Sequence, residues 1–415
     1  MPGSIIKVVH ISTSSGGGAG TAAYRIHEAL LANGVYSNFI YVHTADKHLQ
    51  SGIRLKQQHN LSDKIMWRLK KYFKVFPDKR KYFNNLLNRI RPMLKCEMAS
   101  IPFSAYNILK DPNVQDADII HLHWVAEMLD YPSFFQNNKK PVVWTLHDMN
   151  PFKGVFHYEQ DEKKNKNISN WLDNKILKIK QKLIHESKHD IKVVSPSQWL
   201  LKKAIESNVF KNIEGHCIRY ALDTEIFSPN NGNNLRERFK IPEKNIVFLF
   251  VAQSVGIYRK GFDLLIEALK DLKTNTVTLL VIGNDDNLEI PGLDIRTLGN
   301  INDDALLRDY YSFADAFIIP SREDNLPNVM LEAMACGTPV LSFNVGGMAE
   351  IIRDGFNGLK AYKTEPEALL NIMNEFIKTK EEYSSEAIRN FALENFSNNI
   401  IAEKYIEVYQ SALKK

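Results

Sequence analysis

Short apolar runs alternate with longer segments of helical periodicity along the whole chain. In the first half, the runs that predict β-strands cover residues 5–11, 39–43, 117–123, 141–146 and 191–195. A helix is predicted from about Thr21, and a second one is predicted from apolar residues at helical spacing, namely Trp171, Ile176, Ile179 and Leu183. Strands separated by helices favour a parallel, doubly wound sheet.

The alternation stops at a breaker cluster, Ser-Pro-Asn-Asn-Gly-Asn-Asn at residues 228–234, which is the linker candidate. It then starts again, with strands predicted at residues 245–252, 277–283, 316–320 and 340–343, and helices at 261–272, 303–313 and up to Met334. The sequence therefore predicts an α/β protein with two domains, residues 1–220 and 221–395. A last helix within residues 396–415 has no strand after it and is expected to pack back on the first domain.

The composition is that of a globular protein, with 415 residues, 44% of them hydrophobic and 24% charged. No apolar run approaches the roughly 18 residues that a membrane span needs, and the start of the chain lacks the pattern of a secretory signal. A cytoplasmic protein is therefore expected. The three cysteines, Cys96, Cys217 and Cys336, are far apart and form no Cys-x-x-Cys pair, so each is expected to be a small buried apolar residue.

The net charge of +5 hides an uneven distribution. Residues 54–95 contain thirteen Lys and Arg but only two acids, so this insertion carries +11 and the rest of the chain −6. Aromatic and aliphatic residues interleave with these charges, as in an amphipathic helix. Two interpretations stay open: a solvated helix face whose apolar side packs on the domain, or a peripheral contact with an anionic membrane surface. Nucleic acid is not an expected partner, because no nucleic-acid-binding motif accompanies the charge.

A glycine-rich turn follows the first predicted strand, with Gly16, Gly17, Gly18 and Gly20 before the first helix. Such glycines let the backbone approach a ligand, and the free amides of a helix start suit a phosphate or sugar oxygen. The turn is not a Walker A loop, since no Gly-Lys-Ser/Thr follows. A tight turn that only packs the helix on the sheet remains the alternative.

A second motif runs from Pro320 to Val340 and predicts a strand, a loop, a short helix and a strand. Asn325 is expected to cap the helix, with Pro327 in its first turn. The loop acids then lie at the carboxyl end of a strand, where open α/β sheets bind ligands. Glu332 lies about two turns into the helix, so it is expected to hold a different part of a ligand, or to be a buried glutamate.

Several further motifs accompany these two. They are Asp-Ile-Ile-His-Leu-His-Trp at 118–124, Trp-Thr-Leu-His-Asp at 144–148, Val-Ser-Pro-Ser at 194–197, Arg-Lys-Gly-Phe-Asp-Leu-Leu at 259–265 and the block 314–358. Together with the glycine-rich turn, they make the sequence resemble the retaining nucleotide-sugar glycosyltransferases of family 4. That resemblance implies the GT-B fold, in which two Rossmann-like domains face each other across a cleft.

The resemblance also implies roles for particular residues. His147, Lys260 and Asp324 are implied to be catalytic, with His147 near the donor sugar and Lys260 on the diphosphate. The implied donor-binding residues are Gly17, Gly18, Arg259, Lys260, Glu323, Asp324, Asn325, Leu326, Pro327, Asn328 and Glu332.

The sequence departs from the family pattern at two points. Aspartate stands at Asp324 where the family has glutamate, with Glu323 beside it, so both acids are candidates for the contact with the sugar. The family's diphosphate-binding arginine has no match, since Gln253 and Ser254 occupy that region. Arg259 is adjacent to Lys260, but its side chain is expected to point another way.

The function expected from these observations is transfer of a sugar, with retention, from a UDP- or GDP-sugar to a glycan or lipid-linked acceptor in cell-surface polysaccharide biosynthesis. No metal and no cofactor are expected, because Lys260 and the helix start can supply the positive charge. Two alternatives stay open: a nucleotide-sugar epimerase with the same fold, and a non-catalytic nucleotide-sugar-binding or membrane scaffold protein.

Overall fold

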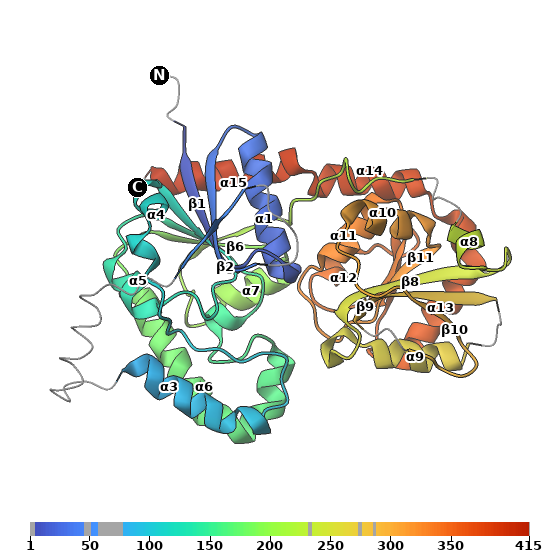
Figure 1. Ribbon diagram of the computed structural model, residues 1–415, viewed down its shortest axis with the longest axis horizontal. Helices are drawn as coiled ribbons and strands as arrows, with labels where there is room; N and C mark the ends of the chain where they lie inside the picture. The colour runs from blue at the N-terminus through green and yellow to red at the C-terminus, as the bar shows by residue number, and fades with distance from the viewer. Residues whose placement is uncertain are drawn as a thin grey trace. The chain divides into compact units, whose positions relative to one another are not determined.

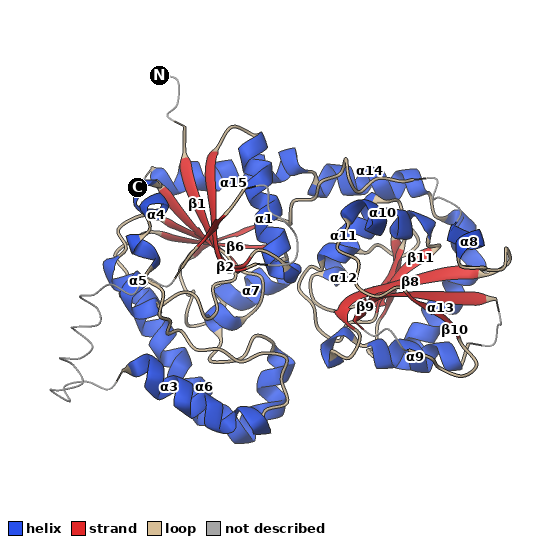
Figure 2. Ribbon diagram, viewed as in Figure 1, coloured by secondary structure: helices blue, strands red, loops and turns tan. Residues whose placement is uncertain are grey.

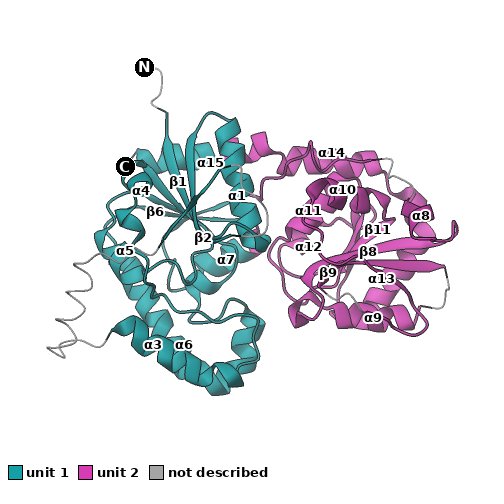
Figure 3. Ribbon diagram, viewed as in Figure 1, with its two compact units in different colours: residues 1–195, 200–217, 405–415 teal, residues 196–199, 218–404 magenta. Residues whose placement is uncertain are grey.

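The computed structural model describes residues 5–44, 51–56, 78–230, 235–272, 276–284 and 288–414. The chain forms two compact units, shown in different colours in Figure 3. Unit 1 comprises residues 1–195, 200–217 and 405–415, and unit 2 comprises residues 196–199 and 218–404. Each unit is an α/β layer structure in which helices pack on a parallel sheet (Figure 2).

Unit 1 contains a seven-stranded sheet in the order β3-β2-β1-β4-β5-β6-β7, with every pair parallel. Its strands are β1 (Lys7–Ser14), β2 (Tyr36–His43), β3 (Ile53–Arg54), β4 (Ile119–Leu122), β5 (Val142–Thr145), β6 (Ile191–Ser195) and β7 (Glu214–Cys217). The central strands are buried on both faces, which is typical of parallel sheets covered by helices.

The helices that begin or end in unit 1 cover both faces of this sheet (Figure 1). They are α1 (Gly17–Ala32), α3 (Lys79–Ile90), α4 (Pro112–Asp116), α5 (Tyr131–Asn137), α6 (Glu159–His185), α7 (Gln198–Ile205) and α15 (Asn398–Leu413). Neighbouring residues of a strand point to opposite faces, and β5 shows how the two faces are covered. Trp144 stacks on Phe135 of α5, whereas the hydroxyl of Thr145 lies 2.9 Å from that of Tyr405 in α15.

Unit 2 contains a six-stranded parallel sheet in the order β10-β9-β8-β11-β12-β13. Its strands are β8 (Ile246–Ser254), β9 (Val277–Asn284), β10 (Asp294–Thr297), β11 (Ala316–Ile319), β12 (Val340–Phe343) and β13 (Gly358–Ala361). Its helices are α8 (Leu235–Arg238), α9 (Phe262–Lys270), α10 (Asp304–Phe313), α11 (Asn328–Ala335), α12 (Met348–Ile351), α13 (Pro366–Thr379) and α14 (Ser385–Phe396).

The core of unit 2 has two layers, one on each side of β11. Ile318 belongs to an apolar cluster with residues of α9 and α13, including Leu265 and Phe376. Phe317, which points the other way, meets Tyr311 of α10 edge-on at a centroid distance of 5.5 Å. Helices therefore exclude water from both faces of this sheet as well.

The nine predicted strands are all present, with ends that differ from the prediction by at most three residues. Four strands were not predicted, namely β3, β7, β10 and β13. These are the two edge strands of each sheet. Most of them are short and polar, for example Glu-Gly-His-Cys in β7 and Asp-Ile-Arg-Thr in β10, because an edge is only partly buried and needs no continuous apolar run.

Several local expectations need correction. Trp171 was expected on the packed side of its helix, but it is 50% exposed, whereas Ile176 and Leu183 are buried. Of the cysteines, Cys336 is buried but Cys96 and Cys217 are only half-buried.

Two predicted segments lie partly outside the described residues. Of the linker candidate 228–234, residues 231–234 are outside them, and Asn230 belongs to unit 2, where its side chain donates to Asp309 (2.7 Å). Of the basic insertion 54–95, residues 57–77 are outside them and α3 covers most of the rest. Among the described residues, no helix is both long enough and apolar enough to cross a bilayer.

Candidate active site

The glycine-rich turn lies at the point where the strand order of the unit 1 sheet reverses. β1 pairs with β2 on one side and with β4 on the other. The chain first adds β2 and β3 on one side of β1 and then crosses back to add β4 to β7 on the other side. Ligands of open α/β sheets bind beyond the carboxyl ends of the strands at such a point. Gly16–Gly18 follow β1 there, and His123 and Trp124 follow β4.

The glycines of this turn differ in what surrounds them. A Cβ atom on Gly20 would lie 2.6 Å from the backbone oxygen of Ser14, so this glycine is needed for packing α1 on the sheet. A Cβ on Gly17 or Gly18 would meet no described atom within 4 Å, although the φ of +69° at Gly17 itself favours glycine. The packing interpretation therefore explains Gly20 but leaves the identity of Gly18 unexplained.

His147, just after β5, is the last member of a line of three histidines. Its Nε2 lies 3.2 Å from Nδ1 of His123, and Nε2 of His123 lies 2.8 Å from Nδ1 of His10 in β1. Burial lowers the pKa of His147 to about 4 and holds the pKa values of His10 and His123 well below the usual range. All three rings are therefore neutral at pH 7.

The tautomers of neighbouring neutral rings depend on one another, because each N···N contact needs one protonated nitrogen as donor and one unprotonated nitrogen as acceptor. Nε2 of His10, at the buried end of the line, has no hydrogen-bond partner among the described residues. A buried N–H without a partner is rarer than a buried acceptor without one. We therefore assign the protons to Nδ1 of all three, so that His10 donates to His123 and His123 donates to Nε2 of His147.

Nitrogens of His10, His121 and His123 lie within 4.8 Å of one another, which is close enough to share a metal ion. However, His121 already uses both nitrogens, with Tyr409 (2.7 Å) and Thr145 (2.8 Å), and His123 uses both in the line just described. A metal ion would have to break these hydrogen bonds. We interpret the cluster as a hydrogen-bonded support for the strand ends.

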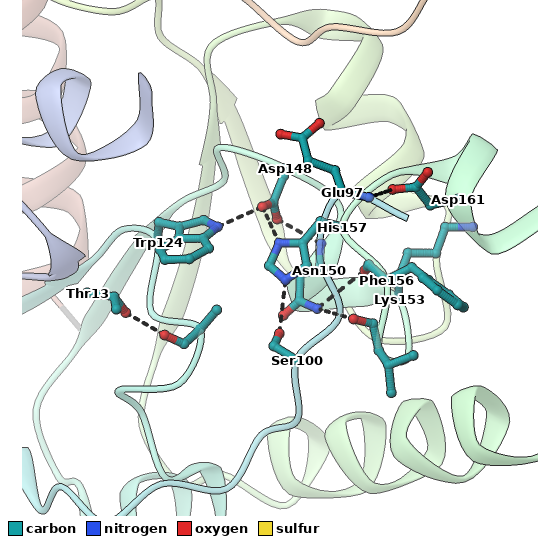
Figure 4. A network of polar contacts seen from close by, with 12 residues as sticks. Thr13, Glu97, Ser100, Trp124, Asp148, Asn150, Lys153, Phe156, His157 and Asp161 are labelled. Atoms are coloured by element: carbon teal, nitrogen blue, oxygen red, sulfur yellow. Dashed lines mark hydrogen bonds and ion pairs between the residues drawn. The ribbon is translucent and has the colours of Figure 1, made fainter. Parts of the chain in front are cut away.

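Asp148, the residue after His147, holds the loop that follows β5 through its own hydrogen bonds (Figure 4). The carboxylate of Asp148 accepts hydrogen bonds from the indole of Trp124 (2.8 Å), from His157 (2.6 Å) and from the backbone N–H of Asn150 (2.9 Å). Burial acts to raise the pKa of Asp148, but His157 and these donors outweigh it and hold the pKa below its usual range. An ionised Asp148 thus ties the loop after β4 to the loop after β5.

Ser100 completes a line of serine, histidine and aspartate, since its hydroxyl lies 2.9 Å from Nε2 of His157. Serine hydrolases use the same order of residues. Here Ser100, His157 and Asp148 are only 2%, 1% and 7% exposed, so a substrate carbonyl cannot reach the hydroxyl. The network is therefore structural, and the sequence analysis missed it because its members lie far apart in the chain.

The strand order of the unit 2 sheet reverses at β8, which pairs with β9 on one side and β11 on the other. The loop after β8 leads to a short 3₁₀ turn, Tyr258–Lys260, and the loop after β11 contains Glu323 and Asp324. Gly261 connects the two loops closely: its φ is +71°, and a Cβ there would lie 1.8 Å from the backbone oxygen of Pro320. Only glycine fits at this position.

Lys260 and Arg259 meet on one carboxylate in these loops. The Nζ atom of Lys260 lies 2.7 Å from Oδ2 of Asp324, and a guanidinium nitrogen of Arg259 lies 3.2 Å from the same oxygen. The expectation that Arg259 points away from Lys260 is therefore wrong, because the tight turn before Gly261 brings both side chains to the same side. Burial opposes ionisation of Asp324, but the two cations hold its pKa below the usual range.

The residues after Asp324 lead into α11. The helix begins at Asn328, with Pro327 just before it, so Asn325 is not its cap. Instead, Asn325 accepts a hydrogen bond from the hydroxyl of Ser197 (2.5 Å). Leu326 is buried, and so is Glu323, whose backbone oxygen accepts from Arg259 (3.0 Å).

Glu332, in the second turn of α11, is only 5% exposed. One of its oxygens accepts a hydrogen bond from the hydroxyl of Tyr311 in α10 (2.9 Å). The carboxylate is therefore held in a fixed orientation by the helix beside it. The structure brings Lys260, Arg259 and Asp324 into direct contact, whereas His147, Gly17 and Gly18 belong to unit 1.

Comparison with known proteins finds a family profile that matches part of unit 2. The profile of the family "Glycosyl transferases group 1" matches residues 245–379. The matched segment lies within unit 2 and is about a third of the chain. A glycosyltransferase of Methanocaldococcus jannaschii that has not been characterised is 31% identical over 193 residues, which cover 44% of this chain and 49% of the relative.

Solved structures resemble the chain over nearly its whole length. Anabaena HepE in complex with UDP-glucose aligns with a TM-score of 0.66 and 16% identity, covering 98% of this chain and 100% of that one. WaaG, a glycosyltransferase involved in lipopolysaccharide biosynthesis, aligns with a TM-score of 0.60 and 16% identity, covering 97% and 99%. The predicted fold class, α/β with two Rossmann-like sheets as in GT-B glycosyltransferases, is confirmed.

The two glycines of the turn are expected to respond in opposite ways to alanine. Gly18→Ala should leave thermal stability unchanged or raise it, since alanine favours a helix over glycine by up to about 1 kcal/mol. It should lower turnover with a nucleotide sugar at least about tenfold, because a methyl group takes the space of a ligand oxygen. Gly20→Ala should lower the melting temperature through its clash with Ser14. Equal turnover of wild type and Gly18→Ala would contradict a ligand-binding role.

Unit 1 is expected to lose stability on mild acidification. The pKa values of His27, His147 and His189 are lowered by burial to about 4. Between about pH 6.5 and 4 the unfolded chain therefore binds protons that the folded unit does not, which costs about 1.4 kcal/mol per pH unit for each histidine. Limited proteolysis at pH 7 and pH 5 should show unit 1 becoming cleavable first.

The chain supplies its own control, since all twelve histidines lie at or before His216, outside unit 2. A matched variant is His189→Phe, in which the new ring can stack on Phe135 as the imidazole does. It should reduce the proton uptake on unfolding by about one proton between these pH values. A pH dependence that is the same in this variant and in wild type would contradict the assignment for His189.

Proposed function

We propose that this protein is a retaining glycosyltransferase that moves a sugar from a nucleotide-diphosphate donor to a glycan or lipid-linked acceptor. The observation that carries the proposal is the cluster of Lys260, Arg259 and Asp324, which lies where the strand order of the unit 2 sheet reverses. All three residues lie within the part of the chain that matches the group 1 profile, residues 245–379.

The charges of this cluster suit a diphosphate. Two cations share one carboxylate, so the three groups carry a net positive charge. Cleavage of the bond between the anomeric carbon and the phosphate oxygen leaves negative charge on the departing diphosphate, and preorganised cations stabilise that charge most in a site shielded from water. Arg259 can take the part of the arginine that has no match elsewhere in the sequence.

Asp324 then has two roles in the proposal. Without donor it holds Lys260 and Arg259 in place, so the two cations lose little freedom when a diphosphate binds. With donor, Asp324 and Glu323 are the acids available for sugar hydroxyls, and Glu332 is the acid available for the ribose. Tyr311 keeps the Glu332 carboxylate oriented for this contact.

The reaction we propose needs no nucleophile from the protein. The acceptor oxygen attacks the anomeric carbon on the face from which the diphosphate leaves. The bond between the anomeric carbon and the diphosphate oxygen breaks, its electron pair stays on that oxygen, and a phosphate oxygen takes the acceptor's proton. His147 is neutral, and its Nε2 accepts a hydrogen bond from His123 in our assignment. It is therefore suited to orient the donor sugar as a hydrogen-bonding partner and not as a cation.

The donor and acceptor classes follow from the same reasoning. A UDP-sugar is the first donor to test because HepE, which shares the fold, was solved with UDP-glucose; a GDP-sugar is the second. Cell-surface polysaccharide biosynthesis is the proposed setting, in line with WaaG. We propose that transfer needs no divalent metal and no cofactor, that the chain works in the cytoplasm, and that its basic insertion 54–95 brings it to the membrane.

Incubation with a panel of UDP- and GDP-sugars in the presence of EDTA tests this function. Release of free nucleoside diphosphate that depends on an acceptor, with an unchanged anomeric configuration in the product, is the expected result. A changed sugar without transfer would indicate an epimerase. Tight nucleotide binding without turnover would indicate a binding or scaffold protein, and turnover only with added metal would contradict metal independence.

Lys260→Ala should lower the rate of transfer roughly 10²- to 10³-fold, as expected for loss of one preorganised group that stabilises the leaving group, about 3–4 kcal/mol. The fold should persist, because Arg259 still pairs with Asp324. Lys270→Ala, which removes an exposed lysine of α9 in the same unit, is the matched control and should keep the wild-type rate. A rate for Lys260→Ala within twofold of wild type, with an intact fold, would refute the assignment.

A further inference from the structure

Two helices of unit 1, α3 and α6, pack side by side (Figure 1) and share an apolar core. That core includes Phe83 and Leu87 of α3 and Leu172 and Ile176 of α6, all buried. Beyond the core, Asn165 of α6 exchanges hydrogen bonds with the backbone of Lys95 (2.8 and 3.0 Å) just after the α3 segment. The two helices therefore form one rigid surface layer, with their outer faces exposed.

The outer face of α6 carries a stripe of lysines around one tryptophan. Its members are three, four or seven residues apart, so they lie on one side of the helix. All are exposed, and they are Lys164, Trp171, Lys175, Lys178 and Lys182. No Asp or Glu lies on this stripe between Lys164 and Lys182; at its two ends, Asp161 stands three residues before Lys164 and Glu186 pairs loosely with Lys182 at 3.8 Å.

The outer face of α3 continues this surface. Tyr82 and Arg89 are seven residues apart and thus on one side of α3, and Met93 follows four residues later. The ammonium group of Lys175 lies 5.4 Å from the centre of the Tyr82 ring, so the two stripes meet. Helix α3 contains no acidic residue.

The composition of this α3–α6 face is costly for an isolated protein. Lys178 and Lys182 are like charges four residues apart, an arrangement that destabilises a helix by a few tenths of a kcal/mol. Tyr82, Met93 and Trp171 leave 45%, 53% and 50% of their surfaces in water. Neither feature stabilises the fold, so the arrangement points to a partner that is anionic and also accepts apolar side chains.

We propose that the α3–α6 face binds the surface of an anionic lipid bilayer. Lysine and arginine side chains close to the bilayer surface are attracted to anionic head groups. Tryptophan, tyrosine and methionine side chains enter the boundary between head groups and acyl chains, where a ring can keep its polar group in water. Single-stranded nucleic acid would match the charges and could stack bases on Trp171 and Tyr82, but it offers no apolar layer for the aliphatic side chain of Met93.

This surface differs from the one that the sequence indicated. The sequence analysis assigned the charge to residues 54–95, whereas four of the five cations of the α3–α6 face lie on α6, outside that insertion. Trp171 was expected to be packed and is the most exposed tryptophan among the described residues. The inference does not rest on sugar transfer, since it uses only charge, exposure and helix geometry.

Cosedimentation with vesicles tests the proposal on the full chain. Phosphatidylcholine vesicles with and without phosphatidylglycerol should show binding of the wild type only, or mainly, when the anionic lipid is present. The variant K164Q/K175Q/K178Q/K182Q should bind the anionic vesicles at least about tenfold more weakly. Its melting temperature should change little, because the loss of like-charge repulsion offsets the loss of the contact between Lys175 and the Tyr82 ring.

A matched control removes the same number of charges elsewhere. K244Q/K270Q/K363Q/K378Q changes four exposed lysines of unit 2 and should bind the vesicles as wild type does. Equal weakening in both variants would mean that only net charge matters, and unchanged binding of the α6 variant would also overturn the proposal. Trp171→Ala should weaken vesicle binding at high salt, where charge attraction is screened.

Two outcomes separate this proposal from its alternatives. Stronger binding of the wild type to RNA than to anionic vesicles, lost in the α6 variant, would assign the face to nucleic acid and overturn the lipid proposal. Turnover with a water-soluble acceptor should be the same in wild type and the α6 variant. Loss of vesicle binding with retained turnover would support the lipid surface even if the donor or acceptor proposed above proves wrong.

Discussion

The candidate site depends on one constraint, which is the parallel pairing of β1 in unit 1, and of β8 in unit 2, with a neighbouring strand on each side. A strand at the reversal of strand order has its carboxyl end flanked by loops that diverge, and backbone N–H groups and side chains of those loops are left facing solvent. The glycine-rich turn and His123 lie at that point in unit 1, and Lys260 and Asp324 lie there in unit 2. The strand order, not the loop sequence, therefore decides which loops can share a ligand.

Burial of polar groups then decides how these loops are held. In unit 1 the supports are neutral imidazoles and one ionised carboxylate, Asp148, each with hydrogen-bond donors or acceptors that offset the cost of leaving water. In unit 2 the support is an ion pair with two cations on Asp324. The line of three neutral histidines and the Asp148 carboxylate of unit 1 keep their charge states near neutral pH. The ion pair of unit 2 has one more cation than it has anions, and this excess positive charge can attract an anion.

The interior strands of both sheets could be predicted from the sequence, whereas the edge strands could not, and this difference has a physical reason. The interior strands are rich in apolar residues, whereas the edge strands β3, β7 and β10 are partly exposed and leave no such signal. The edge strand β13 is largely buried, but its four residues, Gly-Leu-Lys-Ala, form no apolar run. Among the site residues, the pairing of Arg259 with Asp324 could not be predicted, because it depends on a turn closed by Gly261 against Pro320. His121 in β4 and His123 just after that strand are two residues apart, and that spacing was the available signal for the histidine cluster.

Helix α6 contacts the loop that follows His147 with its inner side and forms part of the α3–α6 face with its outer side. On its inner side, Lys180 is fully buried and donates to the backbone oxygens of Asn150, Lys153 and Gly154 (2.6, 3.1 and 2.7 Å), while Asp173 accepts from Val155 (2.7 Å). Burial lowers the pKa of Lys180 to about 7, although the nearby carboxylates of Asp173 and Asp148 act to raise it. The same helix that presents lysines outward thus fixes the loop that follows His147 and Asp148. A surface that immobilised α6 would immobilise that loop with it.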